Sequence, residues 1–337
     1  MDIFWYALTG LLLVGYLTLE SMDFGVGMLF FFGRSDAERE RLRRTVVPLF
    51  LANEVWLIAF AGLLFGALPL LEEGLVSGLR SPVVVLVCLW CLRDAGLWFR
   101  PALPGTGWRR AWDVVIPVSS LLLAAGWGAV LAVLVRGLSS TGDGVATATA
   151  GDLLHPYALA SAAVFVVASL RQGLFLTVRN APGGVPPVAR TDQFGRRLTW
   201  TLLGLILVTA VLGLVFAGSP VAVAINALLP AVAVLGSGRD HGAGRSTRAL
   251  VRGTAPLIAL PVTVAVAHGT TVLATRSGDG GLALGDVIAD SSTLGLLAAI
   301  VLPVLVAVGF AQVWMWRVFG RAADRADLSD REPRPAV

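Results

Sequence analysis

The feature that most constrains this chain is the recurrence of long apolar segments along almost its whole length. Segments of about 20 residues follow one another, each dominated by Leu, Val, Ala, Ile and Phe, and a helix of about this length crosses the hydrocarbon layer of a membrane. Only 14% of the residues are charged, whereas about a quarter are charged in soluble domains. The sequence therefore predicts an all-α integral membrane protein and excludes a soluble fold.

We expect about nine transmembrane helices, at residues 3–31, 46–71, 82–100, 112–135, 155–178, 198–217, 220–236, 254–275 and 290–318. Only Gly218, Ser219 and Pro220 divide the sixth from the seventh, so a count of eight is the alternative. Residues 1–320 are interpreted as a single polytopic membrane domain. Residues 321–337 are rich in Arg, Asp and Pro, which favours a flexible cytoplasmic tail.

The arginines predict how these helices are oriented. All 26 basic residues are Arg, and 21 of them lie in the loops after the first, third, fifth and seventh spans or at the C-terminal end. The intervening loops hold only Arg80, Arg136 and Arg276. By the positive-inside rule the N-terminus faces out and the C-terminus faces the cytoplasm, an alternation that an even number of spans would break. The formal charge of +4 thus reflects membrane orientation and gives no reason to expect a nucleic-acid partner.

The start of the chain also bears on the topology. The first apolar segment has no basic residues before it and runs directly into polar sequence. A cleavable signal peptide has a basic N-terminal region, so we expect this segment to stay in the protein as the first helix.

Polar residues inside the predicted helices indicate where chemistry can take place. A charged side chain at mid-bilayer costs about 2.5–3.5 kcal/mol, so several at one depth must face one another, a partner or water. Glu20 and Asp23 share one helix face, as a proton-carrying pair would, and Glu54 is the deepest relative to its flanks. Polar residues that lie nearer the membrane surface can instead extend their side chains to water or cap a helix. The polar residues in the predicted cytoplasmic half are Glu20, Asp23, Asn53, Glu54, Arg93, Asp94, Asp113, Arg171 and Gln172.

Metal and haem chemistry have little support in the residues themselves. Cys88 and Cys91 stand three apart in an apolar helix, which favours a buried pair of small residues over a redox motif. His155 and His268 are interpreted as cap-like or internally bonded histidines, and the four Met residues give no paired His/Met spacing for an axial ligand set. We therefore expect no metal site and no haem on this chain, and any redox cofactor on another chain.

Two stretches resemble one known family. Residues 15–28 read Gly-Tyr-Leu-Thr-Leu-Glu-Ser-Met-Asp-Phe-Gly-Val-Gly-Met. They are similar to the first helix of subunit II of the cytochrome bd quinol oxidases, where Asp-Gly-Phe-Asp is followed by Gly-Val-Gly-Met. Residues 48–57, Pro-Leu-Phe-Leu-Ala-Asn-Glu-Val-Trp-Leu, resemble the family pattern Pro-x-Trp-Asp-Gly-Asn-Glu-Val-Trp-Leu. The first 115 and last 35 residues contain nearly all of the resemblance, and residues 180–285 match only in hydropathy.

The resemblance implies a fold of two four-helix bundles plus one extra helix in the bacterial plasma membrane. It also implies a heterodimer with a homologous subunit I, which holds the haems, oxidises quinol and reduces O2 to water with protons from the cytoplasm. In that family subunit II holds no haem, supports assembly, can bind a structural quinone and contributes acids to a proton path. We expect lipid and quinone as further partners, with a small accessory subunit as an optional one.

The chain departs from the family pattern at its proposed proton-carrying positions. The first Asp of the helix 1 motif is Glu20, and the helix 2 acid is replaced by Leu51, which cannot carry a proton. Either Glu54 takes over this role, or the proton path runs through subunit I, or the chain is a diverged paralogue with altered haem content or no oxidase activity. Our hypothesis is a relay formed by Glu20, Asp23 and Glu54.

Other residues are candidates for binding. Those considered for contact with a structural quinone or another subunit are Asn53, Trp56, Arg93 and Arg100. Two alternative functions stay open at this point: a non-catalytic scaffold subunit of a diverged bd-like complex, and a proton-coupled transporter.

Overall fold

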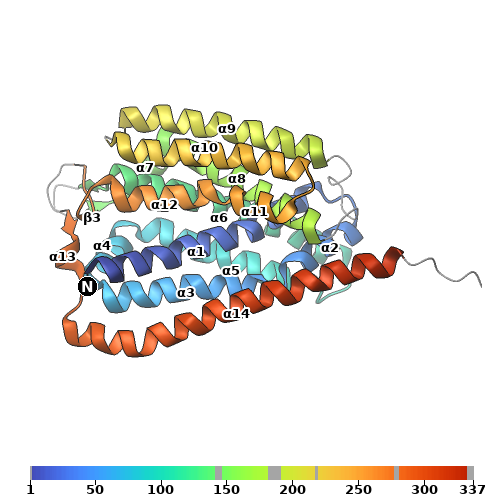
Figure 1. Ribbon diagram of the computed structural model, residues 1–337, viewed down its shortest axis with the longest axis horizontal. Helices are drawn as coiled ribbons and strands as arrows, with labels where there is room; N and C mark the ends of the chain where they lie inside the picture. The colour runs from blue at the N-terminus through green and yellow to red at the C-terminus, as the bar shows by residue number, and fades with distance from the viewer. Residues whose placement is uncertain (1, 141–145, 181–190, 217–218, 277–280, 332–337) are drawn as a thin grey trace, which may run out of the picture.

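The structure, a computed structural model, describes residues 2–140, 146–180, 191–216, 219–276 and 281–331. The described chain is almost entirely helical, with its long helices lying side by side (Figure 1). Within these ranges, nine helical segments are long and apolar enough to cross a membrane: Asp2–Phe32, Phe50–Ala67, Arg80–Phe99, Thr106–Arg136, Pro156–Asn180, Gln193–Phe216, Pro220–Gly242, Ser246–Ala267 and Ser291–Val318. The predicted all-α membrane fold with nine spans is confirmed, and the sixth and seventh spans are separate helices.

The long elements are α1 (Asp2–Leu29), α3 (Phe50–Ala67), α5 (Arg80–Phe99), α6 (Thr106–Arg136), α8 (Pro156–Asn180), α9 (Thr191–Phe216), α10 (Pro220–Gly242), α11 (Ser246–Gly253), α12 (Ala255–Ala267) and α14 (Ser291–Arg331). Shorter elements are the 3-10 turn η1 (Phe30–Phe32), α2 (Asp36–Val46), α4 (Pro69–Gly78), α7 (Ala150–Leu153) and α13 (Leu284–Val287). Two small antiparallel pairs join β1 (Ser139–Ser140) to β2 (Ala146–Thr147) and β3 (Thr271–Leu273) to β4 (Leu282–Ala283).

The second span is shorter than the predicted range 46–71. It ends at Ala67, and a new helix, α4, begins at Pro69 after Leu68 leaves the helical conformation. Proline has no backbone N–H and clashes with the preceding turn, so it starts a helix more readily than it continues one. Hydropathy alone does not register this break because the residues around it are all apolar.

The eighth span is shifted from the predicted range 254–275. It consists of α11 and α12, which meet at Thr254, and it ends at Ala267. Gly269 has φ 64°, a left-handed conformation that glycine adopts readily, and the chain then enters β3. The end of the predicted span is therefore a turn and a strand.

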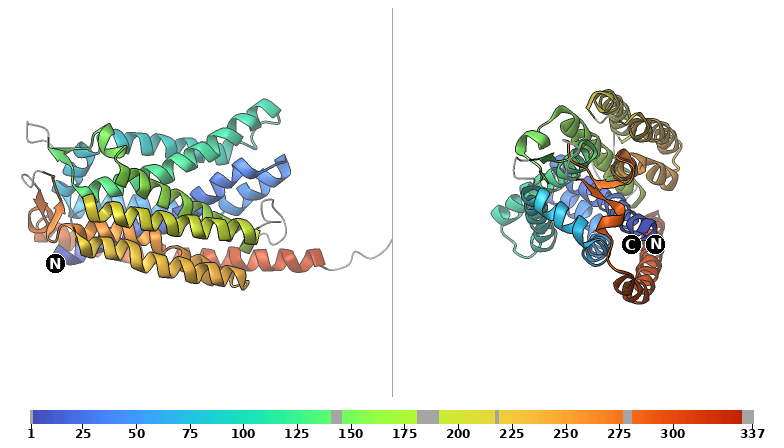
Figure 2. Two further views of the ribbon diagram at one scale, coloured as in Figure 1. Left: turned by 90° about the horizontal axis from the view of Figure 1, so that it is seen from above. Right: turned by 90° about the vertical axis from the view of Figure 1, so that its left-hand side faces the viewer.

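The nine spans form two four-helix bundles and one peripheral helix, as the family resemblance implied. α1, α3, α5 and α6 pack as one bundle, and α8, α9, α10 and α12 as the other, with α8 against both α1 and α6 (Figures 1 and 2). α14 lies outside both bundles and packs mainly on α3. α14 continues through residues 321–331, residues 332–337 lie outside the described ranges, and the flexibility expected of 321–337 stays a prediction.

The two bundles meet where α1 and α8 approach each other backbone to backbone. A Cβ atom at Gly25 would overlap the carbonyl group of Ser169, and one at Gly173 would overlap the backbone of Gly25 and Val26. Membrane helices associate through close van der Waals packing, for which small residues are needed at the contact. These glycines therefore fix the distance between the bundles.

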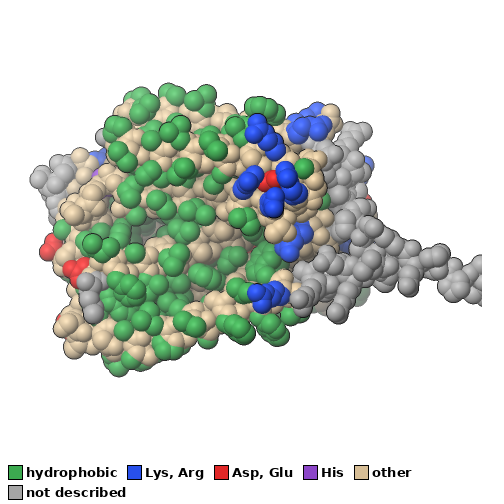
Figure 3. Space-filling view, viewed as in Figure 1, with side chains coloured by type: hydrophobic (Ala, Val, Ile, Leu, Met, Phe, Trp, Pro, Cys, Tyr) green, Lys and Arg blue, Asp and Glu red, His purple; other side chains and the backbone are tan. Residues whose placement is uncertain are grey.

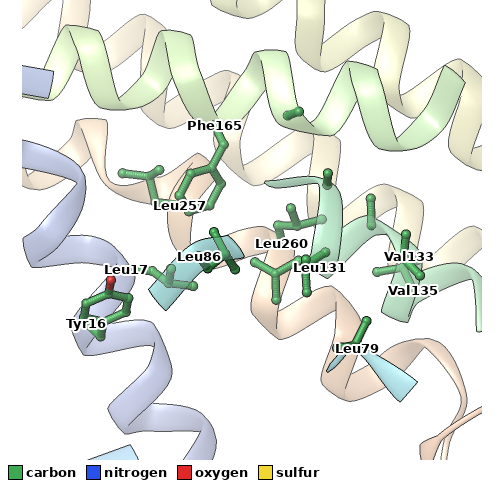
Figure 4. Packing of buried hydrophobic residues seen from close by; sticks show 14 of the residues in the cluster. Tyr16, Leu17, Leu79, Leu86, Leu131, Val133, Val135, Phe165, Leu257 and Leu260 are labelled. Atoms are coloured by element: carbon green, nitrogen blue, oxygen red, sulfur yellow. The ribbon is translucent and has the colours of Figure 1, made fainter. Parts of the chain in front are cut away.

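Large apolar side chains fill the space between the helices. Figure 4 shows part of the buried cluster, in which α5, α6, α8 and α12 supply Leu86, Leu131, Phe165, Leu257 and Leu260. Cys88 and Cys91, by contrast, are exposed on α5, so the expectation that they form a buried pair is wrong. A membrane helix is apolar on its lipid-facing side as well, and hydropathy therefore does not distinguish that side from the packed one.

The charged residues are divided between the two ends of the molecule. On the face seen in Figure 3, basic side chains gather at the end where α11 and the far end of α14 lie. The opposite end holds the N-terminus, α4, α13 and the small strands. This separation agrees with the arginine pattern of the sequence, while the assignment of the basic end to the cytoplasm stays a prediction.

An ion pair ties two loops together at the end opposite the basic one. Asp152 pairs with Arg276, and its carboxylate accepts hydrogen bonds from the Thr149 backbone at 2.9 Å and the Ser139 hydroxyl at 3.0 Å. Burial opposes ionisation of Asp152, but these bonds outweigh it and lower the pKa of Asp152 to about 2. The connection between α6 and α8 is therefore held to the segment that follows α12.

Candidate functional site

Three helices of the first bundle place four acidic side chains around one buried arginine. α1, α3 and α5 each supply at least one of them, and Glu20, Asp23 and Arg93 are no more than 1% exposed. Charged groups at such depth are tolerated only when they pair with one another or reach water. We call this group, consisting of Glu20, Asp23, Glu54, Asp94 and Arg93, the carboxyl cluster.

Arg93 holds the carboxyl cluster together. Its Nη1 donates to Glu20 Oε1 on α1, and its Nη2 donates to Glu54 Oε1 on α3 at 2.7 Å. Its Nε donates to the adjacent Asp94 at 2.9 Å, and its guanidinium lies 5.5 Å from the centre of the Phe24 ring. One side chain of α5 thus links carboxyl groups on three helices.

Asp23 extends the cluster toward α14 through a line of amides. Asn53 Nδ2 donates to Asp23 Oδ2 at 2.8 Å, and Asn53 Oδ1 lies 3.0 Å from the side-chain amide of Gln312 on α14. The Trp56 indole N–H lies 3.4 Å from the same amide. The polar contacts of the first bundle therefore continue into the peripheral helix.

The cluster has unused capacity for protons. Within the described residues, Glu20 Oε2 and Asp23 Oδ1 are buried and have no hydrogen-bond partner. Glu54 Oε1 accepts a second bond, from the Trp90 indole at 2.8 Å. A carboxylate only accepts hydrogen bonds, whereas a protonated carboxyl can also donate one. With three carboxyl groups bound to one guanidinium and a fourth, Asp23, on the same helix as Glu20, this arrangement can bind and exchange protons.

Arg100, a second buried arginine, belongs to a separate network near α2. Its guanidinium lies 2.6 Å from both Asp113 and Asp36, and 3.7 Å from Glu40. Hydrogen bonds from Arg43 lower the pKa of Glu40 to about 2, against a smaller opposing effect of burial. This network fastens α2 to the ends of α5 and α6.

The structure brings together the three residues of the hypothesised relay. Glu20 and Glu54 bind the same guanidinium, and Asp23 lies three residues from Glu20 on α1. Leu51, which replaces the family acid, is 54% exposed on α3, whereas Glu54 is 5% exposed. The acid that α3 directs into the cluster is therefore Glu54.

The four binding candidates do not form one site. Asn53 and Arg93 belong to the polar contacts described above, and Arg100 lies in the network near α2. Trp56 lines a groove between α1 and α14. The guanidinium groups of Arg93 and Arg100 are both occupied by carboxylates and Asn53 is 1% exposed, so of these four candidates only Trp56 lines the groove.

Sequence reasoning missed two members of these contacts, Trp90 and Gln312. Trp90 lies midway along α5 within an apolar segment, where nothing in the sequence marks it as a hydrogen-bond donor to a buried acid. Gln312 had a usable signal, because it is an amide within the long apolar segment 290–318. Such a residue needs a partner inside the membrane.

Two of the three histidines have backbone partners. His155 Nδ1 accepts a hydrogen bond from the Tyr157 backbone at 3.2 Å, and His268 Nε2 lies 2.9 Å from the Val135 carbonyl. In the part of the chain that the structure describes, no three His, Cys, Asp or Glu side chains are arranged to hold a metal ion.

Comparison with known proteins identifies the family. Residues 1–319 match the family described as cytochrome bd terminal oxidase subunit II. The chain belongs to this family. Together with the nine apolar helices found among the described residues, membership makes this subunit II chain a multi-pass protein of the bacterial plasma membrane.

Individual relatives of the subunit II chain agree with this assignment. It is 29% identical over 206 residues to cytochrome bd ubiquinol oxidase subunit 2 of Bacillus subtilis, covering 60% of this chain and 59% of that protein. It is 31% identical over 174 residues to cytochrome bd-I ubiquinol oxidase subunit 2 of Escherichia coli K12, covering 50% and 46%. The matches thus span about half the length of these relatives.

A solved structure shares the fold. The bd oxidase from Geobacillus thermodenitrificans contains a chain that superposes with a TM-score of 0.73 at 15% identity, covering 94% of this chain and 98% of that one. At this identity the similarity establishes the fold alone.

Proposed function

We propose that this chain is the haem-free subunit II of a bd-type quinol oxidase, in which a haem-bearing subunit I oxidises quinol and reduces O2 to water. In this proposal it supports assembly of subunit I and contributes to proton uptake from the cytoplasm. The observation behind the proton role is the carboxyl cluster, which joins acids of three helices around Arg93. Family membership supports the place of the chain in the complex.

The cluster suggests an order for proton movement. The Asp94 side chain is 20% exposed and is its most accessible acid, so Asp94 is the entry. Glu54 and Glu20 follow, since both bind Arg93, and Asp23 comes next on α1. A fixed guanidinium keeps the carboxyl groups close while protons neutralise the excess of negative charge. The residues hold and pass protons, and the haems of subunit I supply the redox chemistry.

Further partners belong to the same proposal. Asn53, Trp56, Arg93 and Arg100 stay the candidates for contact with a structural quinone or another subunit, and Trp56 is the one of these four that lines the groove between α1 and α14. Lipid and an optional small accessory subunit complete the expected complex.

Replacing Glu54 with Gln tests the proton role. Glu54→Gln keeps the shape of the side chain and its hydrogen bonding to Trp90, but it removes the ionisable group. General acid–base groups contribute about 100-fold or more to a rate, so we expect quinol oxidase turnover to fall by about that factor. Oxygen consumption by the purified two-subunit complex, recorded across pH with the haem spectrum as a measure of assembly, provides the measurement.

Glu73→Gln is the matched control, because Glu73 is an exposed acid on α4 far from the cluster in sequence and fold. It should leave turnover unchanged. An active Glu54→Gln complex with normal turnover and an unchanged pH profile would refute the relay.

The scaffold alternative has one observation in its favour, the replacement of the family acid by the exposed Leu51. If the chain is only a scaffold, the complex with Glu54→Gln should keep its full haem content and full activity. The complex should then lose haem only when the whole chain is absent. A colourless preparation without a second membrane chain would instead favour a transporter.

A further inference from the structure

A groove of about 790 Å³ opens on the membrane-facing surface where α1, α11 and α14 lie near one another. Its walls are mostly apolar and include Leu11 and Val14 on α1, Leu250 and Val251 on α11 and Val313 on α14. The carboxyl cluster does not line it. The groove therefore needs an explanation of its own.

Two arginines stand at the basic end of this groove without acidic partners. Arg179, the second-last residue of α8, and Arg317, near the end of the ninth span, both line it. Among the described residues, neither has a carboxylate within ion-pair distance, whereas Arg93 and Arg100 are paired several times over. The Arg179 guanidinium lies 5.6 Å from the centre of the Trp316 ring, which holds it at the mouth of the groove.

The groove has the dimensions of one lipid leaflet. Its lining follows α1 from Met22 to Leu11, which at 1.5 Å per residue is about 16 Å. Half of a hydrocarbon layer about 30 Å thick is about 15 Å. The arginines lie at the ends of the apolar segments of α8 and α14, which is the depth of lipid headgroups.

We propose that this groove binds one anionic phospholipid, with the phosphate at Arg179 and Arg317 and an acyl chain lying along Val313, Leu250 and Leu11. The carbonyl oxygens of a quinone can accept hydrogen bonds from arginine, but a neutral quinone carries no negative charge to balance two cations. In a zwitterionic lipid, the ammonium group of the headgroup offsets part of the attraction. The bound lipid links α8 and α11 to α14, a helix that otherwise packs mainly on α3.

Native mass spectrometry of the intact detergent-solubilised complex tests this proposal. Dioleoyl phosphatidylglycerol and dioleoyl phosphatidylcholine are titrated separately, and the lipid-bound fraction is measured without reference to oxidase activity. Each arginine near an anionic headgroup contributes enough that Arg179→Gln combined with Arg317→Gln should weaken phosphatidylglycerol binding about 30-fold. Phosphatidylcholine binding should change little.

The matched control is Arg110→Gln combined with Arg197→Gln, which removes two exposed arginines from the basic end outside the groove. It should retain phosphatidylglycerol binding. Equal losses in both double variants, or equal binding of the two lipids by the unaltered complex, would overturn the proposal. So would a quinone mass bound to the unaltered complex and lost from the Arg179/Arg317 variant.

A second variant tests the acyl-chain path without altering charge. Val313 is 52% exposed in the groove, and Val313→Trp should occupy the space that the acyl chain needs. We expect it to reduce phosphatidylglycerol binding while the complex stays assembled. Unchanged binding would place the lipid elsewhere and refute the assignment.

Discussion

Arg93 is the residue on which the arrangement of acids in the first bundle depends. It is 1% exposed and pairs with Glu20, Glu54 and Asp94, which belong to three different helices. Removing one partner from a buried ion pair leaves the others uncompensated, which costs more than the pair contributes when intact. Arg93 therefore stabilises the bundle as well as positioning its acids.

Arg93→Gln should destabilise the chain by roughly 3–5 kcal/mol, because three carboxyl groups lose their cation. Adding Glu20→Gln to this variant should recover part of the lost stability, since it removes one of the carboxyl groups left without a cation. Thermal unfolding of the purified complex in detergent measures both effects, with Arg80→Gln, an exposed arginine on the same helix, as control. Equal midpoints for Arg93→Gln and Arg80→Gln would contradict this account.

Residue depth could be predicted from the sequence, but pairing could not. Distance from the ends of an apolar segment places Glu20 and Glu54 at similar levels, and the structure brings them to one guanidinium. Which cation they share depends on how α5 is rotated about its axis. An apolar helix in a membrane does not encode that rotation in a simple hydrophobic stripe.

At the scale of the elements, the contact between α1 and α8 decides how the two bundles fit together. Gly25 and Gly173 face each other there, and neither has room for a side chain. The glycine-rich end of the first helix was available in the sequence as a family pattern. The physical reason for these glycines is the close approach of α8, whose Gly173 lies 148 residues after Gly25, and only the structure shows that approach.

Gly25→Ala should therefore destabilise the protein, because its methyl group would overlap the Ser169 carbonyl, a backbone atom that cannot rotate away. Overpacking of this kind typically costs about 1–3 kcal/mol. Gly10→Ala on the same helix is the control, since no atom lies within 4 Å of its added Cβ. Thermal unfolding midpoints of the two variants should differ clearly, and similar midpoints would show that the contact is not tight.

The whole molecule has one basic end and one end made of short helices and strand pairs (Figures 1 and 3). The number of spans and the two-bundle architecture could be predicted because length, hydropathy and arginine spacing all repeat along the chain. The exact ends of the second and eighth spans could not, since Pro69 and Gly269 interrupt helices without changing hydropathy.

The predicted orientation can be measured on intact cells. With Cys88 and Cys91 replaced by Ser, an impermeant maleimide should label Ser77→Cys on α4 and leave Ala37→Cys on α2 unlabelled until the cells are opened. Both positions are exposed, so access to reagent depends only on the side of the membrane. The opposite pattern of labelling would invert the topology.

The peripheral place of α14 has a consequence for how the chain is made. α14 follows the other eight spans along the chain, and it packs mainly on α3, outside both bundles. The first eight spans can thus complete their mutual contacts before the ninth is synthesised. We therefore expect biosynthesis to pass through a body of eight packed helices, onto which the ninth helix docks afterwards.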